Sequence, residues 1–229
     1  TGYDEISLLS LSSGDYTFIE PLLSFLMDRY YGERVALALP SLRVETLTKK
    51  LMDDIRRVRK TSFTLAPEAG TQRLRNVINK GNTEEELLKT VRGVFEAGWK
   101  AVKLYFMIGL PGETAEDLEG ITSLAHKVLR EGRHRAQVTV SLSTFVPKPH
   151  TPLQWSRQIT MAETMEKHDY FRQAIRNRNI SVKWHDSRMS LLEGMLSRGD
   201  EQTGLLVEEA FRRGARFDGW SDLFQFQHW

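Results

Sequence analysis

The feature that most constrains this chain is a repeated alternation of short apolar runs with amphipathic helical patterns. Apolar runs begin near residues 6, 35, 62, 101 and 138, and segments whose apolar residues recur every three or four positions separate them. Strands that alternate with helices at such intervals form right-handed βαβ units, which build a parallel sheet. Periodicity leaves two architectures open, namely a doubly wound open sheet and a β/α barrel.

The sequence also predicts where several elements begin and end. Strands are expected over residues 6–11, 35–39, 62–65, 101–108 and 138–145. The run 101–108 is nearly all apolar, which predicts a strand buried on both faces. Gly32 is predicted to end the first helix. Capping boxes predict three helix starts, at Thr17 with Glu20, Thr83 with Glu86, and Thr160 with Glu163.

The chain changes character after Pro147. Residues 147–152 contain three prolines and are predicted to be extended. A helix with Met165, Phe171 and Ile175 on its inner side, a short strand over 180–184, and helices over 188–198 and 203–213 are expected to follow. We therefore predict a partial barrel over residues 1–155 and a mainly helical C-terminal extension over 156–229 that packs on it.

Composition excludes several classes of protein. Lysine and arginine number 32 and aspartate and glutamate 30, so the net charge of +2 indicates no long-range attraction to nucleic acid or anionic membranes. The longest apolar runs fall short of the roughly 18 residues that a membrane span needs, and we expect a cytoplasmic protein. With no cysteine, the chain alone offers no disulfide and no thiolate-held zinc or iron–sulfur site. Because it begins at Thr1, close to an apolar run, we expect a piece of a longer chain.

The loops that follow the predicted strands carry the candidate chemistry, because ligands of βα folds bind where strands end. These loops combine hydroxyls, charged groups and glycines that allow a ligand to approach the backbone closely. A carboxylate can accept hydrogens from an amino group, and an arginine can hold a carboxylate in a bidentate pair. The two common glycine-rich phosphate motifs are absent. The loops therefore favour a zwitterionic, nucleoside-like ligand over a polyphosphate.

Several of these loops resemble those of one enzyme family. Residues 107–114 (MIGLPGET) resemble a strand signature of radical S-adenosylmethionine (SAM) enzymes, in the branch of the methylthiotransferases and the elongator catalytic subunit. Residues 67–75 (PEAGTQRLR), followed by 79–81 (NKG), resemble the preceding block of that branch, and 12–15 stand where relatives have a Gly-Gly-Glu-like loop. The stretch from 145–155 to 217–220 is similar to a cobalamin-associated subgroup of radical SAM proteins.

The resemblance implies a fold and an activity. The fold is an incomplete radical SAM (β/α) barrel, with five of six expected strands. The family cleaves SAM to methionine and a 5′-deoxyadenosyl radical with a 4Fe-4S cluster held by a Cys-x3-Cys-x2-Cys loop, and the radical abstracts a hydrogen from substrate. That loop, the first strand and any cobalamin domain are expected upstream in the same protein. We therefore expect the intact protein to be an enzyme of unknown substrate. This chain alone is expected to be inactive, because it has no ligands for the cluster.

The resemblance also assigns SAM-binding positions, though no catalytic residue and no metal ligand. Asp15, beside Ser13 and Gly14, would accept hydrogen bonds from the SAM amino group. Glu68 would face the ribose, and Arg73 or Arg75 would pair with the SAM carboxylate. Ile108, Gly109 and Val146 would flank the adenine. Ser41 and Arg43, in the second loop, complete the set.

Two alternatives stay open. The chain could be a βα scaffold that binds RNA or a protein partner without catalysis of its own, although its near-neutral charge argues against strong phosphate binding. It could also be an ordinary β/α hydrolase or isomerase, for which His150 and Glu68 are the available groups, although no convincing pair of nucleophile and base stands out.

Overall fold

The structure, a computed structural model, describes residues 2–9, 16–38, 50, 53–54, 63–133 and 136–229. Its helices and strands are, in order, β1 (Glu5–Ser7), α1 (Ile19–Tyr30), η2 (Tyr31–Glu33), β2 (Ala36–Ala38), β3 (Phe63–Glu68), α3 (Gln72–Val77), α4 (Glu84–Glu96), β4 (Ala101–Ile108), α5 (Ala115–Glu131), β5 (Gln137–Thr144), α6 (Met161–Ala174), β6 (Ile180–Trp184), α7 (Ser187–Arg198), α8 (Thr203–Arg212) and η4 (Phe226–His228).

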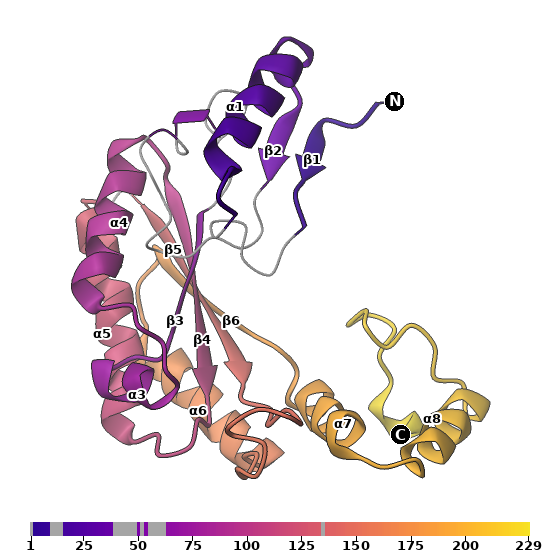
Figure 1. Cartoon of the computed structure of the whole chain (residues 1–229). Helices are drawn as coiled ribbons and strands as arrows, with labels where there is room; N and C mark the ends of the chain where they lie inside the picture. Colours follow the sequence, from indigo (N-terminus) through magenta and orange to yellow (C-terminus); the bar gives the residue numbers. More distant parts are fainter. Residues whose placement is uncertain (1, 10–15, 39–49, 51–52, 55–62, 134–135) are drawn as a thin grey trace.

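The described strands form two parallel sheets, a pair β1-β2 and a sheet in the order β3-β4-β5-β6 (Figure 1). Each strand lies beside its successor within its sheet, as in the curved wall of a β/α barrel. The prediction of an incomplete barrel is confirmed. The strand β6 extends this wall beyond residue 155, and the division into two domains at that residue stays a prediction.

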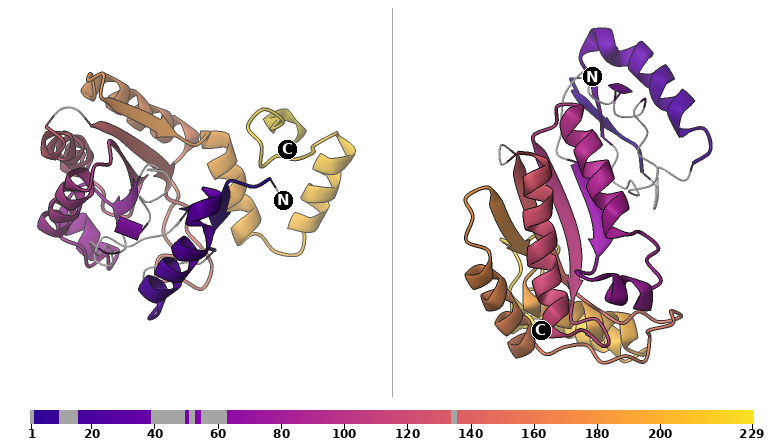
Figure 2. Two further views of the ribbon diagram at one scale, coloured as in Figure 1. Left: turned by 90° about the horizontal axis from the view of Figure 1, so that it is seen from above. Right: turned by 90° about the vertical axis from the view of Figure 1, so that its left-hand side faces the viewer.

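One face of the larger sheet is covered by α4, α5 and α6, which lie side by side (Figure 2). Leu65, Leu104 and Val140 point to this side and are fully buried. They share one apolar core with Val91 of α4 and Phe171 of α6. Burial of apolar side chains on this side therefore holds the helices to the sheet.

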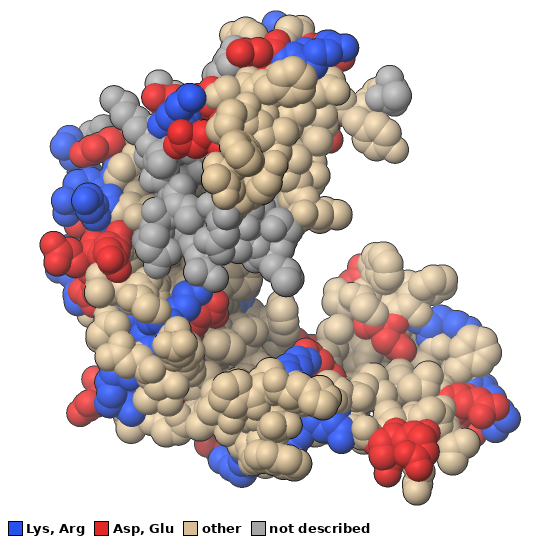
Figure 3. Space-filling model, in the orientation of Figure 1, with Lys and Arg blue, Asp and Glu red and all other residues tan. Residues whose placement is uncertain are grey.

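The opposite face of β3–β6, which we call the inner face, is turned toward a hollow. Figure 3 shows this hollow between the α1 lobe and the α7–α8 extension. In β4, Val102 and Leu104 are buried on the helix side, whereas Lys103 and Tyr105 on the inner face are only partly buried. The prediction that this strand is buried on both faces was wrong, because the helices in the described part of the chain cover only one of them.

The capping predictions are confirmed at two of three helices. Thr83 with Glu86 and Thr160 with Glu163 form complete capping boxes at the starts of α4 and α6. Helix α1 instead begins after Phe18, without a side-chain capping hydrogen bond. Gly32 does not end it either, because the chain continues into η2 and reverses at Arg34, whose φ is 56°.

The C-terminal extension contains α7 and α8 where the sequence predicts helices. In α6, Phe171 and Ile175 at its end are buried as predicted, but Met165 is 58% exposed and does not face the core. No helix in the described part of the chain is long and apolar enough to cross a membrane.

Candidate functional site

The candidate site is the edge of the larger sheet where β3, β4 and β5 end, which we call the rim. Three successive loops meet there through a small apolar cluster that includes Ala69, Leu74, Leu110 and Phe145. The amide of Phe145 donates to the carbonyl of Ile108 at 2.8 Å. The rim is thus a packed unit, as a ligand site at the carboxyl ends of parallel strands requires.

Asp117, at the start of α5, holds two of these loops together. Its side chain is 2% exposed and accepts hydrogen bonds from Thr71, from Arg73 and from the amide and hydroxyl of Thr114 at 2.8 and 2.9 Å. Burial alone would raise the pKa of Asp117, but these hydrogen bonds outweigh it and hold the pKa below its usual value. The carboxylate is therefore ionised, and it ties the β3 loop to the β4 loop.

Both arginines predicted to bind a carboxylate are engaged by the protein itself. Arg73 donates to the Gly112 carbonyl at 2.9 Å as well as to Asp117. Arg75 is 2% exposed and donates to the Ala69 carbonyl at 2.9 Å and to Gln72 at 3.2 Å. These contacts hold the β3 loop in place, and they give no support to a role for either arginine with the SAM carboxylate.

Glu68 ends β3 at an irregularity in the pairing with β4 and has a left-handed φ of 68°. Its side chain is 26% exposed, and Lys80 from the loop after α3 lies 3.4 Å from its carboxylate. Burial raises the pKa of Glu68, and the nearby Lys80 offsets only part of this rise. A non-glycine residue with such a φ is uncommon and often marks a functional position.

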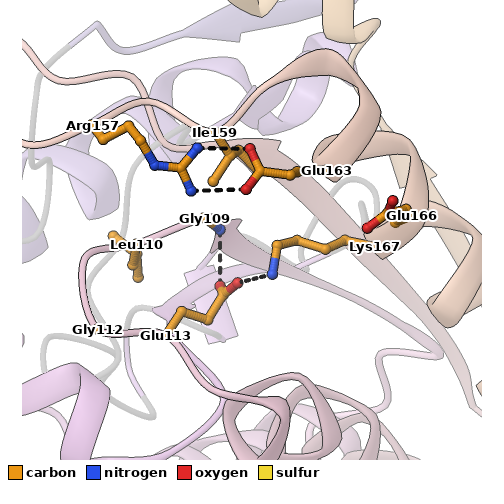
Figure 4. Close-up of a pocket in the computed structure, with 9 residues that line it drawn as sticks. All are labelled: Gly109, Leu110, Gly112, Glu113, Arg157, Ile159, Glu163, Glu166 and Lys167. Atoms are coloured by element: carbon orange, nitrogen blue, oxygen red, sulfur yellow. Dashed lines mark hydrogen bonds and ion pairs between the residues drawn. The ribbon is translucent and has the colours of Figure 1, made fainter.

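Gly109 follows β4 with a φ of 79°, and its amide donates to Glu113 at 2.9 Å. Glu113 in turn pairs with Lys167 of α6 at 2.6 Å, and these groups line a cavity of about 390 Å³ together with the Arg157–Glu163 pair (Figure 4). Both carboxylates already have cationic partners: the Glu113–Lys167 pair attaches α6 to the rim, and the Arg157–Glu163 pair holds the segment just before α6 to its first turn.

The adenine-flanking positions have different surroundings. A Cβ on Gly109 would lie 2.6 Å from Ile159, so this protein side chain occupies the space that the glycine leaves free. Ile108 is 0% exposed, and its side chain belongs to the core on the helix side; its role beside the adenine stays a prediction. Val146 is partly buried on the β5 loop, next to Phe145 of the rim cluster.

The structure brings Glu68, Gly109 and Val146 to one edge of the sheet, because they follow three successive parallel strands. Five further predicted residues lie outside the described part of the chain, namely Ser13, Gly14, Asp15, Ser41 and Arg43. Their roles stay predictions.

Sequence reasoning missed a set of polar residues on the inner face, which includes Lys103, Tyr105, Ser141 and Lys183. Helix-facing and inner-facing residues alternate along β4 and β5. Lys103 and Tyr105 lie two residues apart within an apolar run, and this spacing indicates a strand with one polar face.

Glu163 offers a test of how the start of α6 is held in place. It accepts two hydrogen bonds from Arg157, at 2.7 and 2.8 Å, and one from the amide of Thr160. These bonds lower its pKa to about 2 from 4.5. Because the pKa of Glu163 is depressed in the folded state, the carboxylate stabilises the fold above pH 4.5, and this stabilisation is lost as the pH falls toward 2.

We expect Glu163→Gln to lower the thermal midpoint at pH 7 and to have a smaller effect below pH 4.5. An equal effect at all pH values would contradict this.

Comparison with known proteins gives a family and a fold. The model of the radical SAM superfamily matches residues 2–125. The chain is 34% identical over 199 residues to the uncharacterized protein MJ0966 of Methanocaldococcus jannaschii, covering 86% of this chain and 42% of that protein. It is 25% identical over 114 residues to MJ1620 of the same organism, covering 50% of this chain and 22% of that protein.

A structural likeness supports the same fold. An archaeal Elp3 from Methanocaldococcus infernus, with an N-terminal deletion, superposes with a TM-score of 0.59 at 14% identity, covering 88% of this chain and 55% of that one. The chain spans less than half the length of the two curated relatives it matches.

Proposed function

The chain belongs to the radical SAM superfamily, and from this premise we propose that it forms the SAM-binding portion of a radical SAM enzyme whose substrate is unknown. One observation carries the proposal. The loops that the family resemblance assigns to SAM, at Glu68, Gly109 and Val146, follow adjacent strands and pack together at one rim. A nucleoside-sized ligand can contact all three only in such an arrangement.

The cluster that the family uses does not fit the residues of this chain. A 4Fe-4S cluster is held by cysteine thiolates, and the chain has no cysteine. In this family the reduced cluster supplies the electron that cleaves SAM. We therefore place the cluster ligands outside this chain, and a cobalamin-binding region of the same protein also stays a prediction.

Within this proposal, Glu68 accepts hydrogen bonds from the ribose hydroxyls of SAM. Its carboxylate is partly buried, so hydrogen bonds to it are screened less than on the open surface. Lys80 lies beside it and favours the ionised form. Arg73 and Arg75 act indirectly, because they hold the loop that carries Glu68.

Calorimetric titration of the whole chain with SAM tests this proposal. We expect binding by the wild type and about tenfold weaker binding by Glu68→Gln, since one charge-assisted hydrogen bond contributes about 1.5 kcal/mol or more. Glu86→Gln, the same change in the capping box of α4, serves as the matched control and leaves the affinity unchanged. Equal affinities for all three proteins, or no SAM binding by the wild type, would overturn the proposal.

The pH dependence of SAM binding provides a second test of Glu68. Burial raises its pKa above the usual 4.5, so the side chain takes up a proton at a higher pH than an exposed glutamate does. The protonated form is a poorer acceptor for the ribose hydroxyls. We expect affinity to fall as the pH is lowered, beginning above pH 4.5, and Glu68→Gln to remove this dependence. A wild-type affinity that stays constant over this range would exclude the role.

The proposal also predicts that the chain by itself does not cleave SAM. After anaerobic incubation with iron and sulfide, followed by a strong reductant and SAM, we expect no 5′-deoxyadenosine in a chromatographic assay. Formation of 5′-deoxyadenosine above the level of a protein-free control would contradict this. The alternative of an RNA-binding or protein-binding scaffold stays a prediction.

A further inference from the structure

We propose that the inner face binds an oxyanion of the substrate, a carboxylate or a phosphate, with Lys103 and Lys183 as its cations. This inference rests on the proposed function, because it names a property of the substrate of the same barrel. It concerns a different set of residues from the rim that is proposed to hold SAM.

The pairing of the strands places these residues on one surface. Lys103 of β4 lies beside Thr139 of β5, and Thr139 lies beside Ser181 of β6. In the next inward-facing row, Tyr105 pairs with Ser141, and Ser141 pairs with Lys183. Side chains two residues apart on a strand share a face, so both rows point toward the hollow.

This composition differs from that of a packed barrel. The interior of an ordinary β/α barrel is filled mainly by valine, isoleucine and leucine. Here the inner face of β4, β5 and β6 carries lysine, tyrosine, serine and threonine at its central positions. These side chains form a polar surface in place of an apolar core, in part through hydrogen bonds between Lys103 and Tyr105 and between Thr139 and Ser181. Such a surface suits a polar ligand.

The charge on the β4–β6 part of the inner face has one sign. None of the inner-facing positions of β4, β5 and β6 is aspartate or glutamate. Among the described residues Lys103 contacts the hydroxyl of Tyr105 at 2.7 Å, and the structure records no salt bridge for Lys103 or Lys183. By contrast, Lys80, Lys127, Lys148 and Lys167 each pair with a glutamate. Two lysines that have no carboxylate partner among the described residues, one in contact with Tyr105 and the other paired with Ser141, form a suitable environment for an oxyanion.

The position of the lysines separates them from the SAM loops. Lys103 precedes Gly109 by six residues of extended chain, about 20 Å at roughly 3.3 Å per residue. The two lysines lie on strands two apart and in adjacent inward-facing rows, two residues apart along the strand direction, which places their Cα atoms about 12 Å from each other. The substrate would therefore insert its anionic end below the rim and leave its remainder near the rim.

Lysine acetylation of the whole chain, followed by mass spectrometry, tests this inference. The probes are inorganic phosphate and succinate, each compared with sodium chloride at the same ionic strength. Bound anion should slow acetylation of Lys103 and Lys183 by about tenfold at roughly ten times its Kd. Lys89, exposed on α4, is the internal control and should react at the same rate throughout. Lys183→Gln should abolish protection of Lys103, whereas Lys89→Gln should not.

Each outcome decides the inference. Protection by phosphate alone supports a phosphorylated substrate, and protection by succinate, with or without phosphate, supports a carboxylate. Equal acetylation in phosphate, succinate and chloride would overturn the inference. It would not overturn the proposed SAM site, which calorimetry tests separately. Protection of both lysines by SAM alone would also overturn it, because the lysines would then belong to the SAM site.

Discussion

Gly109→Ala is expected to lower the free energy of unfolding by roughly 2–5 kcal/mol, a large loss for the addition of one methyl group. Two independent costs add at this position. The φ of 79° is left-handed, which costs an L-residue about 1–2 kcal/mol. In addition, the new Cβ would lie 2.6 Å from Ile159, and overpacking of this kind costs about 1–3 kcal/mol.

Two further variants separate these costs. Gly112 has a similar φ of 74°, but a Cβ there would meet nothing within 4 Å. We therefore expect Gly112→Ala to cost only the backbone share, about 1–2 kcal/mol. Adding Ile159→Ala to Gly109→Ala should relieve the overpacking, so that the double variant is more stable than the sum of the single changes predicts. Urea unfolding of the wild type and of each variant measures these losses, and equal losses at Gly109 and Gly112 would contradict the close contact with Ile159.

Asp117→Asn is expected to lower the free energy of unfolding by roughly 2–4 kcal/mol. The carboxylate is buried and accepts hydrogen bonds from Thr71, Thr114 and Arg73, whereas an amide would bring donors against these donors. The pKa of Asp117 is held below its usual 3.8, so its contribution is present above that pH and is lost as the pH falls below it. The difference between wild type and Asp117→Asn should therefore be large at pH 7 and should shrink as the pH falls below 3.8.

The matched control is Asp169→Asn on α6. Asp169 also pairs with an arginine, Arg172, but both side chains are more than half exposed. We expect this change to alter stability by less than about 0.5 kcal/mol, as is usual for surface pairs. Similar losses for Asp117→Asn and Asp169→Asn would show that Asp117 does not organise the rim.

Local sequence patterns predicted the elements that local interactions determine. The bounds of β4 agree with the prediction of 101–108, and the capping boxes at Thr83 and Thr160 form because their partners lie three residues away. The failures involve contacts between distant segments. Arg75 donates to the carbonyl of Ala69, a contact that only the folded loop presents and that local patterns did not predict, while its role with SAM stays a prediction. Lys103 was overlooked within an apolar run, because the local sequence does not reveal which face of β4 the helices α4 and α5 pack against.

The candidate site shows the same division. The order of the loops along the chain predicted that Glu68, Gly109 and Val146 would meet, since parallel strands end at one edge. The tie between the β3 and β4 loops through Asp117 spans 44 residues and has no local signature. The glycine at 109 was interpreted as a point of ligand approach, which stays a prediction; the contact with Ile159, fifty residues later, was not predicted.

If the loops at the carboxyl ends of β3, β4 and β5 form the SAM site, bound SAM should protect their backbone amides. Hydrogen–deuterium exchange of the whole chain with and without SAM measures this protection. We expect slower amide exchange in residues 68–72, 109–114 and 145–148 when SAM is added, with no change in α8. Protection confined to α7 and α8, or no protection at the rim with SAM at saturating concentration, would contradict this expectation.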